Sequence, residues 1–344
     1  MPYFDSFSLK EWFLEERRAL PWRENPSPYR VWVSEIMLQQ TQAAVVIPYF
    51  ERWMRSFPTI EALAQAPLEE VIKLWEGLGY YARARYLHGA AKELLQKHAG
   101  VLPSTKEGLQ QIKGIGLYTV GAILSFAFHK KAAAVDGNVL RVLSRYFAIE
   151  EEIEKAKKRI EALTEEILPE EEPWVVMEAL IELGARVCRK IPLCNECPLK
   201  RSCVGYSQKI AHLLPNKRAR PKTTLLKRAV LLILHGDEIL IGRVEGKKVM
   251  AGLYEFPYKE FAQGEPLASA EEMVSKEFKI SAQFIRDLKE EKHSFTRYQA
   301  TLYPSLWKAH ERIRLEGYEW VSLDALASLP FSSGHLRIMR EFLK

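Results

Sequence analysis

Hydrophobic residues recur at helical spacing along the first 212 residues of the chain. Apolar positions repeated about every three to four residues indicate amphipathic helices, and they predict helices at 68–76, 82–97, 117–128, 138–147, 153–167 and 174–187. Ser8 and Glu11 have the spacing of a capping box, which predicts a helix start at Ser8. Pro28 predicts the start of another helix, which holds Glu35. The pattern therefore indicates an all-α domain over residues 1–212.

The pattern changes after residues 213–225, a basic segment that contains prolines. This composition is typical of a linker, either a solvated connector or one that also contacts phosphates. Two apolar runs, 229–234 and 238–244, then flank His235-Gly-Asp and predict a β-hairpin. A helix at 267–278, strands at 294–308 and 317–322, and a final helix capped by Ser332 or Ser333 are expected to follow. The predicted fold is multidomain, with a smaller α+β domain over residues 226–344.

Length and charge narrow the class of protein. The 344 residues exceed what one ordinary core needs, and the net charge of +6 permits a polyanionic partner without requiring one. The N-terminal segment lacks the apolar core of a signal peptide, and no apolar run approaches the roughly 18 residues of a membrane span. We therefore expect a cytoplasmic protein without a membrane partner.

All four cysteines lie within one short segment, at Cys188, Cys194, Cys197 and Cys203. In a reducing compartment two structural disulfides are disfavoured, so a metal or cluster site is the better interpretation. Zinc ribbons usually pair two Cys-x-x-Cys knuckles, whereas here only Cys194 and Cys197 have that spacing. The sequence therefore favours a [4Fe–4S] cluster over a tetrahedral zinc ion in the loop 188–203.

A Gly-Ile-Gly turn separates two helical stretches within residues 109–121. Glycines at Gly114 and Gly116 allow backbone amides to approach an anion at the start of the following helix. Alone, such a turn is more often a simple tight turn than a binding site. Its position between two helices and upstream of the cysteines favours a helix–hairpin–helix that grips a DNA phosphate.

Two acidic residues are candidates for cleaving a glycosidic bond. Glu35 shares a helical face with apolar residues, so burial should keep it protonated as a general acid; the alternative is an exposed glutamate. Asp136 precedes a helix, where it is either a plain N-cap or a carboxylate kept ionised by the first amides. Cleavage through an oxocarbenium-like state uses such a pair, if the two meet in the folded chain.

These features occur in a familiar order. The helix with Glu35, the segment Trp75–Tyr81, the Gly-Ile-Gly hairpin, Val135–Val139 and the cysteine loop follow one another. This series, which covers nearly the whole chain, closely resembles the adenine DNA glycosylase (MutY) family. The first cysteine spacing differs, with five intervening residues where the family usually has six.

The resemblance implies roles for individual residues. Glu35 would protonate the five-membered ring of adenine, Asp136 would stabilise the sugar cation, Asn138 would support Asp136, and Tyr118 would assist at the sugar. The family's bifunctional relatives have a lysine at the position of Tyr118, which forms a Schiff base. A tyrosine cannot, so the expected enzyme is monofunctional and hydrolyses the bond with water.

Further residues are implied to bind the substrate. Trp22, Arg23 and Glu178 would line the adenine pocket. Gln40, Thr41 and Tyr80 would wedge into the duplex and hold the opposite base, because the target base must leave the stack. The expected partner is duplex DNA that carries adenine opposite 8-oxoguanine or guanine, bound by a monomer.

The C-terminal domain resembles the Nudix-like module with which this family senses 8-oxoguanine. Residues 251–257 and 293–298 carry the resemblance, and Phe295 and Thr296 would contact the lesion. Arg297 replaces the histidine usual at that position. The acidic helix that holds magnesium in Nudix hydrolases is missing, so we expect this domain to bind without hydrolysing.

Three other functions fit parts of the sequence. A thymine-mismatch or oxidised-pyrimidine glycosylase would share the scaffold, but Glu178 and the C-terminal module argue against it. A Nudix nucleotide hydrolase is disfavoured by the missing acidic helix. A cluster-bearing DNA-binding or redox-signalling protein without catalysis is disfavoured by Glu35 and Asp136.

Overall fold

The structure is a computed structural model that describes residues 3–218, 223–244, 246, 250–261, 272–295 and 297–344. The chain divides into two compact units. The first, here called the helical unit, comprises Met1–Gln65 and Tyr86–Ala219. The second, here called the sheet unit, comprises Ala66–Arg85 and Arg220–Lys344. The predicted boundaries at residues 212 and 226 stay a prediction, and the structure groups the short segment 66–85 with the sheet unit.

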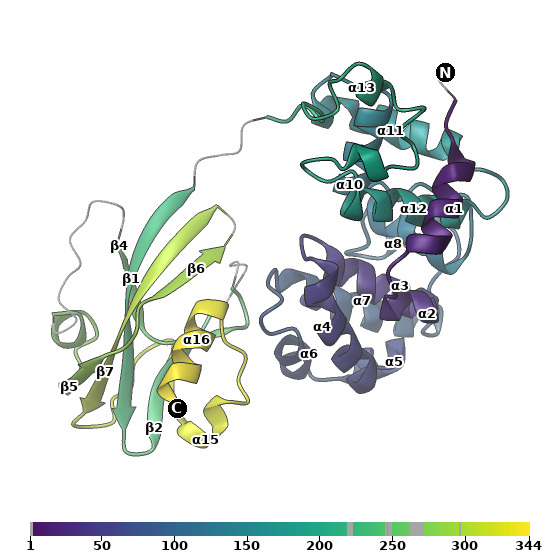
Figure 1. The fold of residues 1–344 in the computed structure, drawn as a ribbon. Helices are drawn as coiled ribbons and strands as arrows, with labels where there is room; N and C mark the ends of the chain where they lie inside the picture. Colours follow the sequence, from purple (N-terminus) through teal and green to yellow (C-terminus); the bar gives the residue numbers. More distant parts are fainter. Residues whose placement is uncertain (1–2, 219–222, 245, 247–249, 262–271, 296) are drawn as a thin grey trace. The chain divides into compact units, whose positions relative to one another are not determined.

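Helices make up the regular structure of the helical unit (Figure 1). They are α1 (Ser6–Glu16), α2 (Pro21–Glu24), α3 (Pro28–Leu38), α4 (Ala43–Ser56), α5 (Ile60–Gln65), α7 (Ala82–His98), α8 (Lys106–Gln111), α9 (Leu117–Ala122), α10 (Gly137–Tyr146), α11 (Ile153–Ile167), α12 (Pro173–Arg186) and α13 (Val204–Ser207). Short helix α6 (Leu68–Leu74) and the first residues of α7, up to Arg85, belong to the sheet unit. The predicted helices other than 117–128 are thus confirmed within a few residues. In the described part of the chain, no helix combines the length and apolarity needed to cross a membrane.

Two helix predictions need correction. The N-cap of α1 is Asp5, whose carboxylate accepts from the Ser8 N–H at 3.0 Å, so the capping box at Ser8 and Glu11 is wrong. The N-cap lies three residues earlier than predicted, and the Asp5 carboxylate satisfies a free amide of the first turn. The stretch 117–128 is not one α-helix, because the π-helical turn η1 (Ile123–Ala127) follows α9. Such turns interrupt helices most often at functional sites.

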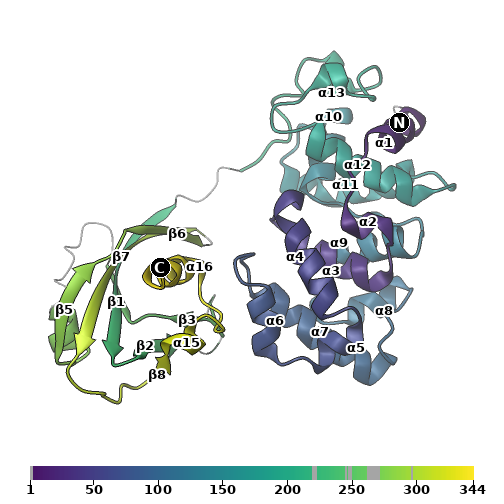
Figure 2. The ribbon, with the colours of Figure 1, turned by 60° about the horizontal axis from the view of Figure 1, so that its bottom comes forward.

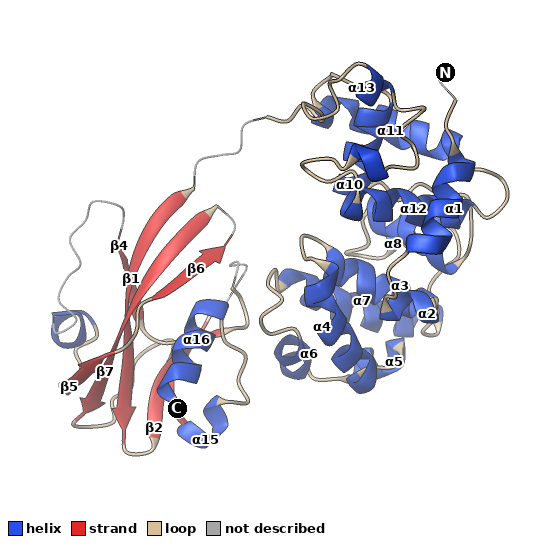
Figure 3. Ribbon diagram, viewed as in Figure 1, coloured by secondary structure: helices blue, strands red, loops and turns tan. Residues whose placement is uncertain are grey.

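Eight strands of the described residues form one mixed sheet in the sheet unit (Figures 1 and 3). They are β1 (Thr224–His235), β2 (Glu238–Arg243), β3 (Tyr254–Glu255), β4 (Tyr258–Phe261), β5 (Ala282–Asp287), β6 (Glu291–Phe295), β7 (Tyr298–Ala309) and β8 (Tyr318–Ser322). Strand β1 is central and pairs with β7 in parallel, whereas its pairings with β2 and β4 are antiparallel. The hairpin of β1 and β2 pairs His235 with Glu238, which confirms the predicted turn at Gly236-Asp237.

The sheet has a hydrophobic core on each face, because successive side chains of β1 point to opposite faces. Val230 and Leu232 face a cluster that includes Leu336 and Met339 of α16 (Ser333–Phe342). Ala229, Leu231 and Ile233 face the opposite cluster, which includes Met273 of the turn η3 (Met273–Glu277). Figure 2 shows α16 against one face of the sheet. The period of two along the strand therefore sets the two cores of this unit.

The remaining predictions for this unit are partly wrong. Residues 294–308 are not one strand but the end of β6 and most of β7, paired at Phe295 and Tyr298. The predicted helix at 267–278 is described only from residue 272, where η3 lies, and its first part lies outside the described residues. Ser332 is the N-cap of α16 by position, although its hydroxyl makes no capping hydrogen bond.

Candidate active site

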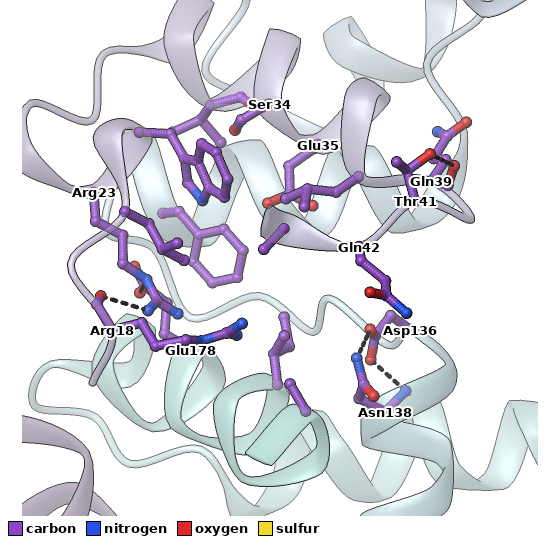
Figure 4. Close-up of a pocket in the computed structure, with 18 of the residues that line it drawn as sticks. Arg18, Arg23, Ser34, Glu35, Gln39, Thr41, Gln42, Asp136, Asn138 and Glu178 are labelled. Carbon is purple, nitrogen blue, oxygen red and sulfur yellow. Dashed lines mark hydrogen bonds and ion pairs between the residues drawn. The ribbon is translucent and has the colours of Figure 1, made fainter. Parts of the chain in front are cut away.

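The helical unit encloses a cavity of about 860 Å³. Its walls come from α2, α3, the segment after α3, the helix α9 that follows the hairpin, the start of α10, and α12. Nine of the predicted site residues line it: Trp22, Arg23, Glu35, Gln40, Thr41, Tyr118, Asp136, Asn138 and Glu178. The fold thus brings together residues that lie up to 156 positions apart (22 to 178) in the sequence (Figure 4).

Glu35 projects into this cavity from a buried helix. Helix α3 begins with Pro28, and Ser27 caps it by accepting from the Arg30 N–H at 3.3 Å. Most side chains of α3 are buried, so Glu35 retains only 6% of its exposed surface. Burial penalises the charged form of a carboxyl group. The helix therefore delivers an acid into an environment that favours its protonated form.

The neighbours of Glu35 adjust its acidity. Burial raises the pKa of Glu35 to about 7, and the nearby carboxyls of Asp136 and Glu178 add to the rise. The Tyr118 hydroxyl donates to Oε2 of Glu35 at 2.6 Å and, with Arg23, opposes it. The pKa of Tyr118 is itself raised well above its ordinary value by burial, so this phenol keeps its proton. An acid that titrates near neutrality is suited to proton transfer at physiological pH.

Asp136 lies at the N-terminus of α10 and is its N-cap. Oδ1 accepts from the backbone N–H groups of Asn138 and Val139, both at 2.8 Å, and Oδ2 accepts from Nδ2 of Asn138 at 2.7 Å. Burial raises the pKa of Asp136, whereas these three hydrogen bonds lower it. Asp136 is therefore the N-cap of α10 and also lines the cavity, where burial outweighs the hydrogen bonds and its pKa is raised; its role as an ionised carboxylate stays a prediction.

The side of the cavity assigned to the base combines an aromatic ring with an ion pair. Trp22 is buried and meets Phe50 edge to face at 5.5 Å between ring centroids. Nε of Arg23 lies 2.7 Å from Oε2 of Glu178. Burial raises the pKa of Glu178, and Arg23 opposes the rise. A flat apolar surface beside a fixed donor–acceptor pair is suited to a planar heterocycle.

The residues expected to wedge into DNA lie in different units. Gln40 and Thr41 follow α3 at the edge of the cavity, and Gln40 has a left-handed backbone with φ of 58°. Tyr80 belongs to the sheet unit, is 49% exposed and also has a left-handed backbone, with φ of 49°. Non-glycine residues in this conformation are uncommon and concentrate at binding sites.

The Gly-Ile-Gly hairpin joins α8 to α9. Gly114 has φ of +96°, and a Cβ there would lie 2.9 Å from Cβ of Tyr86, so both backbone and packing require glycine. At Gly116, the N-cap of α9, a Cβ would meet no atom within 4 Å. Packing within the protein therefore does not explain the second glycine, whereas close approach of an external group would.

The four cysteines lie close together in the loop that follows α12. Cys188, Cys194 and Cys203 all act electrostatically on Cys197, and together with burial they raise the pKa of its thiol to about 12. Among the described residues, no three His, Cys, Asp or Glu side chains are arranged to hold a single metal ion. Backbone amides of Leu199 and Gly205 donate to the sulfurs of Cys197 and Cys203.

Phe295, at the end of β6, is half-buried and packs against the core of the sheet unit. Its ring lies 5.4 Å from that of Tyr298, and the Arg228 guanidinium lies 5.1 Å from its centroid. Thr296 lies outside the described residues. The structure therefore describes one of the two predicted lesion contacts, Phe295, at the end of β6.

The sequence analysis missed several charged residues around the site. Arg18 and the buried Glu182 form an ion pair behind Arg23. Arg141 donates to Oδ1 of Asn138 at 2.8 Å and to the carbonyl oxygen of Cys188 at 2.8 Å, which joins the Asp136 side of the cavity to the cysteine loop. The sequence did carry a signal for Glu182: it lies four residues after Glu178 on one predicted helix, and therefore on the same face.

Comparisons with known proteins agree with this site. The model of the HhH-GPD superfamily base excision DNA repair proteins matches residues 33–170, and that of the NUDIX domain matches residues 229–341. The adenine DNA glycosylase of Buchnera aphidicola subsp. Baizongia pistaciae is 37% identical over 243 residues, 70% of this chain and 69% of the relative. That of Rattus norvegicus is 44% identical over 213 residues, which are 58% of this chain and only 41% of the longer rat protein.

Among solved structures, one described as a thermostable thymine-DNA glycosylase is 27% identical, with a TM-score of 0.55. The match covers 59% of this chain and 95% of that one. The helical catalytic fold followed by a Nudix-like domain is therefore confirmed, as is the resemblance stated from the sequence motifs. The chain belongs to the adenine DNA glycosylase family.

Proposed function

We propose that this protein is a monofunctional DNA glycosylase that hydrolyses the N-glycosidic bond of adenine paired with 8-oxoguanine or guanine in duplex DNA. The carrying observation is the pairing of Glu35 and Asp136 across one cavity, with Arg23 and Glu178 at its base-binding side. Cleavage of a glycosidic bond needs an acid at the leaving group and an anion near the sugar.

The two carboxyl groups divide this work. Glu35, with its pKa near 7, donates a proton to a ring nitrogen of adenine, and the C1′–N9 bond then breaks with the electron pair leaving on the base. Asp136, hydrogen-bonded by the first amides of α10, stabilises the positive charge on the sugar. Water adds to C1′, and its proton passes to the Glu35 carboxylate, which regenerates the acid. The products are free adenine and an abasic site.

The residues that line the cavity favour hydrolysis over strand cleavage. They include no lysine, and the position facing Glu35 is held by the protonated Tyr118. A phenol cannot form the imine with the sugar on which the coupled strand-cutting step depends. Tyr118 instead fixes the orientation of the acid.

Contacts with duplex DNA come from separate parts of the chain. We assign the phosphate contact to the amides at Gly114 and Gly116, because the second glycine faces open space at a helix start. Gln40, Thr41 and Tyr80 wedge into the duplex where adenine is extruded and hold the opposite base. Phe295 and Thr296 read 8-oxoguanine in the opposite strand.

We propose that Cys188, Cys194, Cys197 and Cys203 hold a [4Fe–4S] cluster. Four thiols within electrostatic reach, with backbone amides donating to two sulfurs, fit such a cluster. In a cubane each thiolate binds a different iron, so the sulfurs need not converge on one point as tetrahedral zinc requires. The bound cluster would supply four thiolate bonds that fix the loop.

A second candidate function follows from the similarity to the thymine-DNA glycosylase structure. A glycosylase for thymine mismatches or oxidised pyrimidines would use the same scaffold. Single-turnover excision on duplexes with adenine opposite 8-oxoguanine, adenine opposite guanine, thymine opposite guanine, and an oxidised pyrimidine separates the two. We expect free adenine from the first two duplexes. Release of a pyrimidine base without adenine would overturn the proposed function.

A further inference from the structure

A buried ion-pair cluster forms one wall of the cavity, and two of its members have no role in the function proposed above. Its members are Arg18, Arg23, Glu178 and Glu182. Glu178 and Glu182 lie four residues apart on α12 and therefore on one face of that helix. Glu178 lines the cavity, whereas the side chain of Glu182 is fully buried behind it.

Glu182 gathers both arginines. Its carboxylate accepts from Nε of Arg18 at 2.6 Å and from Nη2 of Arg18 at 3.0 Å, a two-point contact that fixes the guanidinium plane. The same carboxylate accepts from Nη2 of Arg23 at 3.0 Å. Because Glu182 has no exposed surface, it meets these charges without competing water.

The orientation of Arg23 depends on this contact. Each of its three nitrogens has a different partner: Nε pairs with Glu178 at 2.7 Å, Nη2 with Glu182 at 3.0 Å, and Nη1 donates to the Arg18 carbonyl oxygen at 3.2 Å. The guanidinium also lies 5.3 Å from the ring centroid of Phe13. Without Glu182, one end of this planar group would lose its anchor, and Arg23 could turn further toward Glu178.

The cluster also sets the charge beside the proposed acid. Two arginines balance two glutamates, and the groups that act on Glu35 are Tyr118, Asp136, Glu178 and Arg23. Although burial opposes it, Arg18 and Arg23 hold the pKa of Glu182 below its ordinary value, so this residue carries a negative charge. Glu178 is acted on by Arg23, Arg17 and Glu182. Neutralising Glu182 would leave the cluster with one positive charge in excess, and Arg23, which acts directly on Glu35, belongs to that cluster.

We propose that Glu182 is a positioning residue of the base pocket: it orients Arg23 against Glu178 and balances the charge of Arg18 within the cluster. The inference rests on the proposed function and adds to it a residue that touches neither base nor sugar. It acts by placing the donor that faces the base and by keeping the acid protonated near neutral pH.

The test is the pH profile of single-turnover adenine excision by Glu182→Gln in the full-length holoenzyme. Glutamine keeps the shape and one acceptor but removes the charge. Excess positive charge favours the ionised form of Glu35. The fall of the excision rate on the alkaline side of the pH profile, here called the alkaline limb, should therefore move to lower pH by about 1 unit. The loss of rate should accordingly be larger at pH 8 than at pH 6.

Glu16→Gln is the matched control. Glu16 pairs with Arg186 of the same helix α12 at 3.1 Å, but on the surface, so its profile should match that of wild type. Arg18→Gln tests the opposite sign, because loss of a positive charge should move the alkaline limb to higher pH. It also keeps the test decisive if Glu182→Gln does not fold. The double variant of both should return the limb toward wild type.

An alkaline limb that stays in place in both single variants would overturn the inference and leave Glu182 with a purely structural role. Failure of wild type to release adenine from any duplex is a different result. It would overturn the proposed function, and this inference with it.

Discussion

Glu35 combines a proposed catalytic role with a pH-dependent contribution to stability that the structure allows us to work out. Its carboxyl has a pKa of about 7 in the folded chain against 4.5 for an ordinary glutamate, mainly because it is buried. A raised pKa means that the folded state binds the proton more tightly than the unfolded state. The stabilisation is therefore full below the ordinary value and is lost as pH rises through about 7.

We predict that Glu35→Gln removes both effects. A shift from 4.5 to about 7 corresponds to roughly 3 kcal/mol, and most of it, about 2.5 kcal/mol, falls between pH 5 and pH 8. The variant does not titrate, so its melting temperature relative to wild type should be higher at pH 8 than at pH 5. For a unit of this size the expected difference is about 5–10 °C. Excision should fall by at least about 10²-fold, since general acid catalysis is lost.

Thermal denaturation of wild type and Glu35→Gln at pH 5 and pH 8 measures the difference in melting temperature. Single-turnover excision on one duplex measures the loss of activity. DNA affinity at fixed salt serves as the control, because one neutral amide in a large basic interface changes it little. A difference in melting temperature that does not change with pH would refute the assignment of a buried Glu35 carboxyl with a raised pKa. Excision within about ten-fold of wild type would remove Glu35 from the acid role.

Three further predictions follow from other contacts. Tyr118→Phe removes the 2.6 Å hydrogen bond to Glu35, which should move the alkaline limb of excision up by about 1–2 pH units; a limb that moves down would contradict this geometry. Purified protein should contain about four irons per chain and absorb visible light, and Cys197→Ser should yield little soluble protein; stoichiometric zinc would overturn the cluster. Phe295→Ala should lower the preference for 8-oxoguanine over guanine opposite adenine by about ten-fold or more while excision opposite guanine persists; an unchanged ratio in paired single-turnover assays would place lesion reading elsewhere.

The sequence determined those features that depend on neighbours along the chain. Apolar spacing located the helices, the alternation after residue 229 located the first hairpin, and Pro28 marked the start of α3. Motif order was enough to identify the family. Where local signals competed, they misled: Asp5 and not Ser8 caps α1, since either side chain can satisfy the first amides.

Only the tertiary structure decided how these pieces combine into a site. Tyr118 donates to Glu35 across 83 residues of sequence, and Arg18 meets Glu182 across 164. Neither pairing has a local signature, because helical periodicity tells which face is buried but not which partner it meets. The acidity of Glu35 has the same origin. Burial and the carboxyls of Asp136 and Glu178 raise its pKa, Tyr118 and Arg23 oppose the rise, and these neighbours surround Glu35 only once the chain has folded.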